Sequence, residues 1–435
     1  MRRLSKSTSL WHKTVAEKTG RKCVESLSEN SPRCSIRRAI DPALIVILAG
    51  VSAALHVGKL PPALPVLREA LALTLVEAGF LLSLVQLAGM TLGLAVGLAA
   101  DGFGLRRCAV AGLVILSVAS ALGGLAHDAA SLLTLRAFEG LGLLLAVTPA
   151  PSLIRRLATH GHLDAMLGLW GAYMPFGAAA ALLASPWLLL TIGWQAAWWL
   201  LATPSLAMAV WLWIAVPPDA GKKSSASGAW SSRLRRTLSS PGPWLMALTF
   251  AVYSGQWLAI IGFLPSIYAQ AAIAIEVAGP LTALAAAVNV IGNAAAGRLL
   301  QRGVVPPTLL YCGFTAMAAG AVLAFMPAFD VGPVAKYVAV LAFSMIGGLV
   351  PGTLFALSVR LAPDGHTVAT TVGWMQQLSA LGQFIGPPLV AWVANRAGDW
   401  HWTWAVTGAF ALAGVLLSSR IAVLLRKRTQ ALQAA

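Results

Sequence analysis

Residues 42–65 read PALIVILAGVSAALHVGKLPPALP, and this stretch decides the class of protein. It is apolar and long enough for a helix that crosses a bilayer, which needs about 20 residues. Its ionisable residues, His56 and Lys59, are three apart and share one helical face. Because prolines follow between Pro61 and Pro65, we expect the helix to kink or break there. A charge inside a membrane span is by default a candidate functional site.

The composition extends this conclusion to the whole chain. Of 435 residues, 58% are hydrophobic and only 11% are charged, with a mean hydropathy of +0.77. Soluble proteins carry about 25% charged residues, so this is a polytopic membrane protein. Apolar runs of about 20 residues exclude a β-barrel. The net charge of +16 belongs to loops and tails, so it does not indicate a nucleic-acid partner.

The hydropathy pattern predicts an all-α membrane protein with twelve transmembrane helices in two pseudo-symmetric six-helix bundles. The expected spans are 42–65, 76–99, 108–126, 131–153, 165–188, 195–216, 243–268, 277–300, 306–327, 336–358, 368–394 and 402–420. The expected domains are a disordered basic tail (1–40), an N-terminal bundle (41–216), a flexible basic linker (217–242), a C-terminal bundle (243–420) and a C-terminal tail (421–435).

The basic residues predict the orientation. Lys and Arg gather in the two tails, the linker and alternate loops, whereas the opposite loops hold only Arg68, Lys336 and Arg396. Cytoplasmic loops carry the excess of Lys and Arg. We therefore expect both termini in the cytoplasm and a location in the bacterial inner membrane.

The sequence does not indicate an enzyme. The four cysteines lack the spacing of a metal site or a disulfide framework, and the chain has no evident nucleophile–base pair. We therefore predict no catalytic residue, no metal and no cofactor.

The two halves resemble each other at an offset of about 205 residues, as inverted or parallel repeats do in secondary transporters. The matching elements are Arg156-Leu-Ala with Arg360-Leu-Ala, Gly168 and Gly177 with Gly373 and Gly382, and Trp194-x3-Trp198 with Trp400-x3-Trp404. Chance similarity among Gly-, Ala- and Leu-rich helices is the alternative.

Two further motifs resemble those of a known family. The loop Gly97-Leu-Ala-Ala-Asp101-Gly-Phe-Gly104-Leu-Arg106-Arg107 and the helix start Leu135-Arg136-Ala-Phe-Glu139-Gly140-Leu-Gly142 are similar to signatures of the major facilitator superfamily. Segments at 151–156, 167–171 and 257–268 look like its cyanate permease and 2-nitroimidazole transporter branch. That branch carries an arginine-proline pair in helix 1, where this chain has His56 and Lys59, so the positive charge is kept and the fork geometry of arginine is lost.

The resemblance implies that helices 1, 4, 7 and 10 line a central cavity. Candidate substrate-binding residues on the spans are His56, Lys59, Arg136, Glu139, Tyr253, Gln256, Trp257, Gln376 and Gln377. Each has an alternative role. Lys59 can snorkel to the outer headgroups, and Arg136 with Glu139 can form a structural ion pair. Trp257 can face lipid, and the glutamines can bridge helices.

The resemblance also implies a latch at the cytoplasmic side. Asp101 would lie against the start of span 11, near Thr367 and Thr370, where a helix N-terminus favours a carboxylate. Arg106 and Arg107 are either latch partners or markers of topology.

These observations predict a monomeric, secondary active or facilitated transporter of a small anionic or polar organic solute, working by alternating access. His56 or Glu139 is the candidate for coupling to a co-transported proton. The alternatives are an efflux pump for hydrophobic or cationic compounds that antiports protons, and a non-transporting membrane receptor with the same fold.

Overall fold

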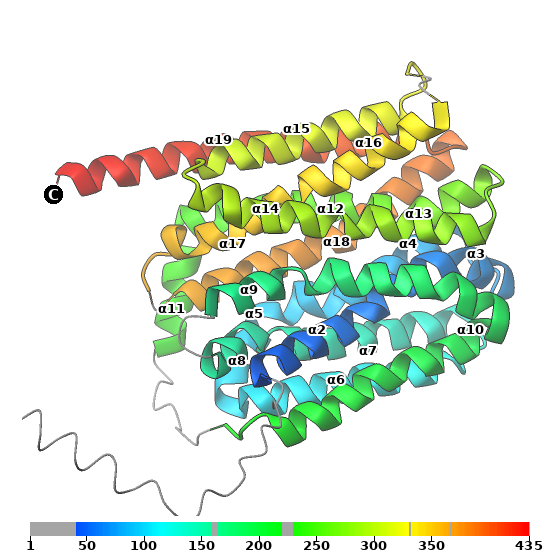
Figure 1. Cartoon of the computed structure of the whole chain (residues 1–435), viewed down its shortest axis with the longest axis horizontal. Helices are drawn as coiled ribbons and strands as arrows, with labels where there is room; N and C mark the ends of the chain where they lie inside the picture. Colours follow the sequence, from blue (N-terminus) through cyan, green and yellow to red (C-terminus); the bar gives the residue numbers. More distant parts are fainter. Residues whose placement is uncertain (1–40, 159–162, 220–228, 330–331, 366, 435) are drawn as a thin grey trace, which may run out of the picture. The chain divides into compact units, whose positions relative to one another are not determined.

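The computed structural model describes residues 41–158, 163–219, 229–329, 332–365 and 367–434. The N-terminal tail lies outside them, so its predicted disorder stays a prediction. All regular elements of the described residues are helices. Figure 1 shows long helices packed side by side within the unit that begins at Asp41.

The N-terminal half holds six membrane crossings, several of them built from two consecutive helices. Its elements are α2 (Pro42–Gly58), α3 (Leu60–Ala70), α4 (Leu75–Ser83), the 3-10 turn η1 (Leu84–Gln86), α5 (Leu87–Phe103), α6 (Leu105–Gly123), α7 (Ala129–Val147), α8 (Ala150–Leu157), α9 (Leu163–Gly171) and α10 (Tyr173–Ala215).

The C-terminal half repeats this plan after a short linker helix. Its elements are α11 (Ala229–Leu238), α12 (Pro241–Gln270), α13 (Ile275–Ala287), α14 (Asn289–Gln301), α15 (Pro306–Phe325), α16 (Gly332–Gly347), α17 (Leu349–Leu361), α18 (Val368–Ala397) and α19 (Thr403–Ala434).

The prediction of twelve spans in an all-helical fold is confirmed. Ten helical stretches of the described residues are apolar and long enough to cross a membrane. One of them, α10, has 43 residues and is broken at Gly193, whose φ of 76° and ψ of 167° are not helical, so it supplies two spans. Helix α18 supplies the twelfth; its 30 residues suffice in length, and Gln376, Gln377 and Gln383 lower its hydropathy.

Local sequence fixes where several spans begin. The Asp41 side chain caps α2 by accepting from the Ala43 backbone N–H at 2.8 Å, and Thr74 and Glu77 form a capping box on α4. Asp128 caps α7 by accepting from the Ser131 N–H at 2.8 Å. This hydrogen bond lowers the pKa of the Asp128 carboxyl below its usual value.

Two glycines let α7 approach its neighbours closely. A Cβ at Gly142 would lie 2.5 Å from the Leu116 backbone N on α6, and one at Gly140 would overlap the Val85 carbonyl next to α5. The close crossings fix the rotation of α7 about its axis. They therefore decide where the neighbouring Glu139 and, about one turn earlier, Arg136 point.

The two halves meet along α4 and α5 against α18, and along α10 against α13. Polar bonds cross the first of these interfaces. The Gln377 amide accepts from the Leu94 N–H at 3.0 Å and donates to the Met90 carbonyl at 2.8 Å. Further along, Gln86 donates to Gln383 at 3.0 Å. These amides join the halves without charged groups.

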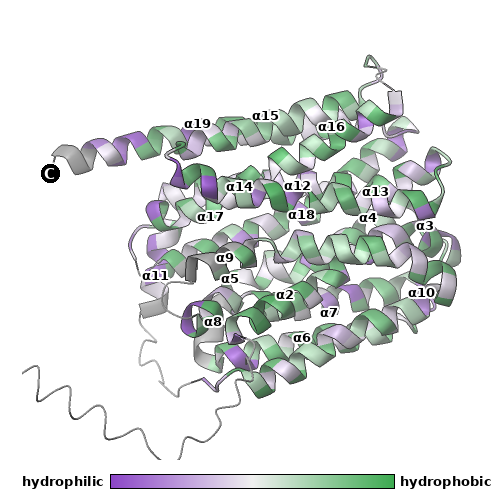
Figure 2. Cartoon of the chain, in the orientation of Figure 1, coloured by the Kyte–Doolittle hydropathy of each residue, from purple (hydrophilic) through white to green (hydrophobic). Residues whose placement is uncertain are grey.

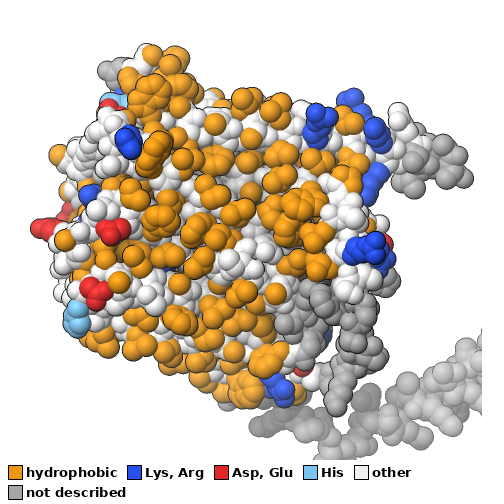
Figure 3. Space-filling view, turned by 180° about the vertical axis from the view of Figure 1, so that it is seen from behind, with side chains coloured by type: hydrophobic (Ala, Val, Ile, Leu, Met, Phe, Trp, Pro, Cys, Tyr) orange, Lys and Arg blue, Asp and Glu red, His pale blue; other side chains and the backbone are white. Residues whose placement is uncertain are grey.

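Charge and hydropathy divide the unit into an apolar middle and polar ends. Residues along the middle of the helices are mostly hydrophobic, and hydrophilic residues concentrate near the helix ends (Figure 2). On the face in Figure 3, most Lys and Arg side chains gather at the end near the last turns of α19, while Asp, Glu and His gather at the opposite end. We call the first of these the basic end.

Described parts of the linker and of the C-terminal segment are helical. The linker contains α11, which Arg236 ties to the C-terminal half through a 2.6 Å ion pair with Asp364. Helix α19 continues past residue 420 to Ala434. The bundle boundaries at 216 and 243 stay predictions.

We predict that Gly142→Ala lowers the free energy of unfolding by about 1–3 kcal/mol, because the added methyl overpacks the α6–α7 crossing. Thermal unfolding of the purified protein, followed by tryptophan fluorescence, measures this. Gly297→Ala is the matched control, since a Cβ there meets nothing within 4 Å. Equal stability of the two variants would show that the α6–α7 crossing is not tight.

Candidate functional site

The four ionisable residues predicted on spans 1 and 4 converge in one buried network. His56 is on α2, Lys59 joins α2 to α3, and Arg136 and Glu139 are on α7. Their exposed fractions are 0%, 1%, 3% and 2%. We call these residues the charged network. Buried charges are tolerated in a membrane span only when they are paired.

Glu139 is the centre of the charged network. One carboxylate oxygen, Oε1, lies 2.5 Å from Lys59 Nζ, and the other, Oε2, lies 2.5 Å from Arg136 Nη1. His56 Nδ1 lies 3.7 Å from Oε1. Two cations therefore share one carboxylate, and the network holds one more positive than negative charge when His56 is neutral.

Lys59 points into the N-terminal half. Its Nζ donates to Ser120 Oγ on α6 at 2.8 Å and lies 4.6 Å from the ring centre of Trp198 on α10. The ring face adds a cation–π attraction. The alternative in which Lys59 snorkels to the outer headgroups is wrong, because its side chain is enclosed by helices.

The neighbours of the two ring nitrogens of His56 indicate which nitrogen carries the proton. Its Nδ1 lies 3.3 Å from Lys59 Nζ, which can only donate, so Nδ1 is the acceptor. Its Nε2 lies 2.9 Å from Ser205 Oγ, whose hydroxyl donates to the Ser52 carbonyl at 3.3 Å. This geometry fits a neutral imidazole whose proton is on Nε2.

Arg136 joins α7 to two other helices. Its Nη1 donates to the His56 carbonyl at 2.7 Å, and its Nε donates to the Leu81 carbonyl on α4 at 3.3 Å. Its Nη2 is buried and has no partner among the described residues. One donor of the guanidinium is thus available for a further acceptor.

The C-terminal half carries an uncharged counterpart on α12, α14 and α16. Tyr253 and Asn289 exchange hydrogen bonds, and Asn289 Nδ2 donates to the Ser344 carbonyl at 2.7 Å. Trp257 Nε1 donates to Ser344 Oγ at 3.1 Å, and Asn293 donates to Asn289 Oδ1 at 2.9 Å. Tyr253 and Trp257 are buried, so Trp257 does not face lipid.

The three predicted glutamines have different surroundings. Gln256 on α12 is fully buried, and neither polar atom of its amide has a partner among the described residues. Gln377 bridges α18 to α5 through its amide. Gln376, its neighbour on α18, is half-buried. Gln256 is therefore the predicted glutamine whose amide has both polar atoms buried and unpaired among the described residues.

At the basic end, the predicted latch residues lie on α5 and α6. Arg106 Nη1 donates to the Val216 carbonyl at 2.8 Å, and its guanidinium lies 4.3 Å from the ring centre of Trp213. These contacts stay within the N-terminal half, and Arg107 is exposed. The side chain of Asp101 lies outside the described residues, so its latch role stays a prediction.

Sequence reasoning missed four residues of these networks: Ser120, Trp198, Ser205 and Asp219. Asp219, just after α10, pairs with Arg156 at 2.6 Å and accepts from the Arg106 N–H at 3.1 Å. The hydroxyls of Ser120 and Ser205 carry no signal in an apolar span. Trp198 was noted only as part of the internal repeat.

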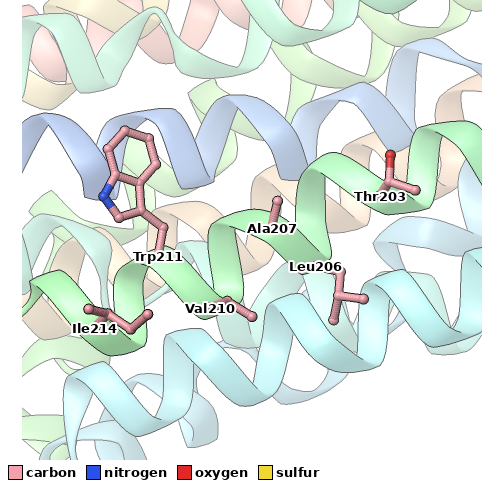
Figure 4. Close-up of a pocket in the computed structure, with 6 residues that line it drawn as sticks. All are labelled: Thr203, Leu206, Ala207, Val210, Trp211 and Ile214. Carbon is pink, nitrogen blue, oxygen red and sulfur yellow. The ribbon is translucent and has the colours of Figure 1, made fainter.

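A groove of about 550 Å³ lies on the outer face of α10. Figure 4 shows the side chains that line it, Thr203, Leu206, Ala207, Val210, Trp211 and Ile214, along this single helix. They are apolar except for Thr203, and Ile214 is 76% exposed. In a membrane this face is covered by acyl chains, so it is not a site for a polar solute.

Comparison with known proteins gives consistent results. The family described as the Major Facilitator Superfamily matches residues 43–387. The chain is 30% identical over 356 residues to the 2-nitroimidazole transporter of Escherichia coli K12, covering 78% of this chain and 84% of that protein. It is 23% identical over 406 residues to the cyanate transport protein CynX of the same organism, covering 87% and 96%.

Solved structures show the same fold. A partially occluded, inward-open conformation of the xylose transporter XylE from E. coli superposes with a TM-score of 0.70 at 15% identity. It covers 87% of this chain and 97% of its own. A D-xylose–proton symporter gives a TM-score of 0.68 at 14% identity. At these identities the likeness concerns the fold alone.

We predict that Glu139→Gln destabilises the protein more than Lys59→Met does. Removing the shared carboxylate leaves two buried cations without a counter-charge, which costs about 3–5 kcal/mol. Lys59→Met keeps the Glu139–Arg136 pair and loses mainly hydrogen bonds, at about 1–2 kcal/mol. Thermal unfolding in detergent measures the order. If Lys59→Met were the more destabilising change, Glu139 would not be the centre of the network.

Proposed function

Because the chain belongs to the major facilitator superfamily, we propose that it transports a small anionic or electron-rich polar solute by alternating access of a site between its halves. The observation that carries this proposal is that two buried cations, Lys59 and Arg136, share the single carboxylate of Glu139. The excess of positive charge favours a solute that brings negative charge or a strong acceptor.

The relatives support this solute class. The names of the two E. coli relatives give a nitroimidazole and cyanate as the compounds transported. Cyanate is a small anion, and a nitroimidazole presents a polarised nitro group with two acceptor oxygens. Both would be favoured by positive potential and by amide donors. A cationic compound would be disfavoured.

Contacts connect the charged network to the helix that carries Gln256. Arg136 Nε bonds the Leu81 carbonyl, and the adjacent Leu82 packs against Gly262 of α12, where a Cβ would lie 3.0 Å from its Cδ1. Gln256 lies six residues before Gly262, or about 9 Å along the helix. We infer that Gln256 contacts the solute directly, while the network sets the local potential.

The packing fits a state closed at the end opposite the basic end. One apolar cluster there draws residues from both halves: Leu60, Leu64, Leu81 and Leu82 from the first, and Ala259, Phe263, Val390 and Ala391 from the second. In the proposed cycle this cluster separates as the halves rock, and the site opens on that side. Bonds such as Gln377 to Met90 would then rearrange.

Two residues of the charged network can couple transport to a proton. His56 and Glu139 are the groups of the network that can change their proton count during transport. Asp101 would act as the latch. We propose a monomer in the bacterial inner membrane with both termini in the cytoplasm, as the distribution of Lys and Arg predicts.

We predict that purified protein in liposomes takes up cyanate or 2-nitroimidazole and that Lys59→Met reduces the uptake of the cyanate anion about tenfold. The variant removes the excess positive charge, worth about 1.7 kcal/mol at 10 Å with an effective dielectric constant of 20. Tetraphenylphosphonium serves as the cationic comparison. Cation transport that needs Glu139 and survives Lys59→Met would instead support the efflux-pump alternative.

We predict that Gln256→Leu raises the melting temperature of the empty protein and weakens solute binding. The buried Gln256 amide has no partner among the described residues and therefore destabilises the empty protein, so its removal should stabilise that state. The same amide would bind the solute, so its removal should weaken binding. Gln377→Leu is the matched control and should lower the melting temperature, because it breaks two inter-half hydrogen bonds. Thermal-shift titration measures both quantities. Unchanged solute affinity in Gln256→Leu would remove Gln256 from the site.

A further inference from the structure

A second groove, of about 320 Å³, lies on the outer surface between α12 and α19. It is lined by Pro241, Trp244, Leu245, Arg420, Val423, Leu424 and Lys427. The two helices pack along each other, so the groove runs between packed elements of one half. It takes no part in the proposed transport site, and its chemistry is independent of the identity of the solute.

Helix α19 contributes two cations to one side of this groove. Arg420 and Lys427 are seven residues apart, or two helical turns, and therefore share a face. Both are exposed, and neither has an ion pair or a hydrogen-bonding partner among the described residues. Val423 and Leu424 lie between them and form an apolar floor.

The opposite wall is held in place by contacts of its own. Trp244 Nε1 donates to the Leu238 carbonyl at 2.8 Å, and its ring packs edge-to-face on Trp374 with centroids 4.8 Å apart. Its side chain is still 38% exposed. A tryptophan with one polar bond and one open face is typical of the membrane interface.

The end of α19, which carries the two cations of the groove, is also held in place by a hydrogen bond. Arg428, one residue after Lys427, donates to the Arg360 carbonyl at 2.5 Å and so ties the end of α19 to the end of α17. The helix that carries Arg420 and Lys427 is therefore in place before any ligand binds.

The groove has the depth of a lipid headgroup. Arg420 lies 17 residues after Thr403, where α19 begins, or about 26 Å along the helix. This is close to the thickness of the hydrocarbon core, so Arg420 reaches the interface at the basic end. Figure 3 shows Lys and Arg gathered at that end of the unit.

From these observations we propose that the groove binds an anionic phospholipid of the leaflet at the basic end. Arg420 and Lys427 hold the phosphate of the headgroup, and an acyl chain lies over Val423 and against Leu245. Basic pockets between transmembrane helices are suited to this chemistry, because each cation is attracted to an anionic headgroup and the apolar floor to the chain.

Native mass spectrometry of the purified full chain tests this proposal, using palmitoyl-oleoyl phosphatidylglycerol and, as neutral comparison, palmitoyl-oleoyl phosphatidylcholine. We expect the wild type to retain the first phosphatidylglycerol in preference to phosphatidylcholine. The double variant R420Q/K427Q should weaken this binding roughly 30-fold, since two cations are removed. Millimolar inorganic phosphate should not displace the lipid.

The control variant R235Q/R426Q removes the same charge from exposed residues of α11 and α19 that do not line the groove. It should bind phosphatidylglycerol like the wild type. Equal losses in both double variants would show that the attraction is a general surface effect, which overturns the proposal. Equal retention of the two lipids by the wild type would overturn it as well. Displacement by phosphate would assign the groove to a free anion.

Discussion

The structure of the N-terminal half depends on the sharing of one buried carboxylate by two buried cations. Glu139 bonds Lys59 with one oxygen and Arg136 with the other, and two hydroxyls, two carbonyls and an indole ring complete the shell. A charge in a membrane span is costly unless it is paired. Helices α2, α6, α7 and α10 therefore pack stably around the charged network only when its charges are paired. A substitution at any residue of the network alters the contacts of several helices.

The two halves share a plan and differ in chemistry. Where the first half uses charge, the second uses Tyr253, Asn289, Ser344 and Trp257 in a neutral network. The two halves contact each other through hydrogen bonds of glutamine side chains and through apolar packing. An interface without ion pairs between its described residues can slide at modest cost, which suits alternating access. The charged network, enclosed in one half, can move with that half as a rigid body.

Much of this could be predicted from the sequence because membranes restrict structure to a small set. The all-helical fold and the number of spans follow from hydropathy. The pairing of Arg136 with Glu139 follows from helical spacing. What could not be predicted is where Lys59 points, because the rotation of α2 is set by close packing such as that at Gly58, where a Cβ would overlap the Ala178 backbone of α10. Ser120, Ser205 and Asp219 join their networks only through tertiary contacts, and Gln256 differs from Gln377 only in what surrounds it.

The most direct test of the account is a cryo-electron microscopy structure of the purified chain with 2-nitroimidazole bound. We expect solute density between the halves within hydrogen-bonding distance of the Gln256 amide, with the Lys59–Glu139 pair intact. Density that lies away from Gln256, or a solute that displaces Lys59 from Glu139, would contradict it.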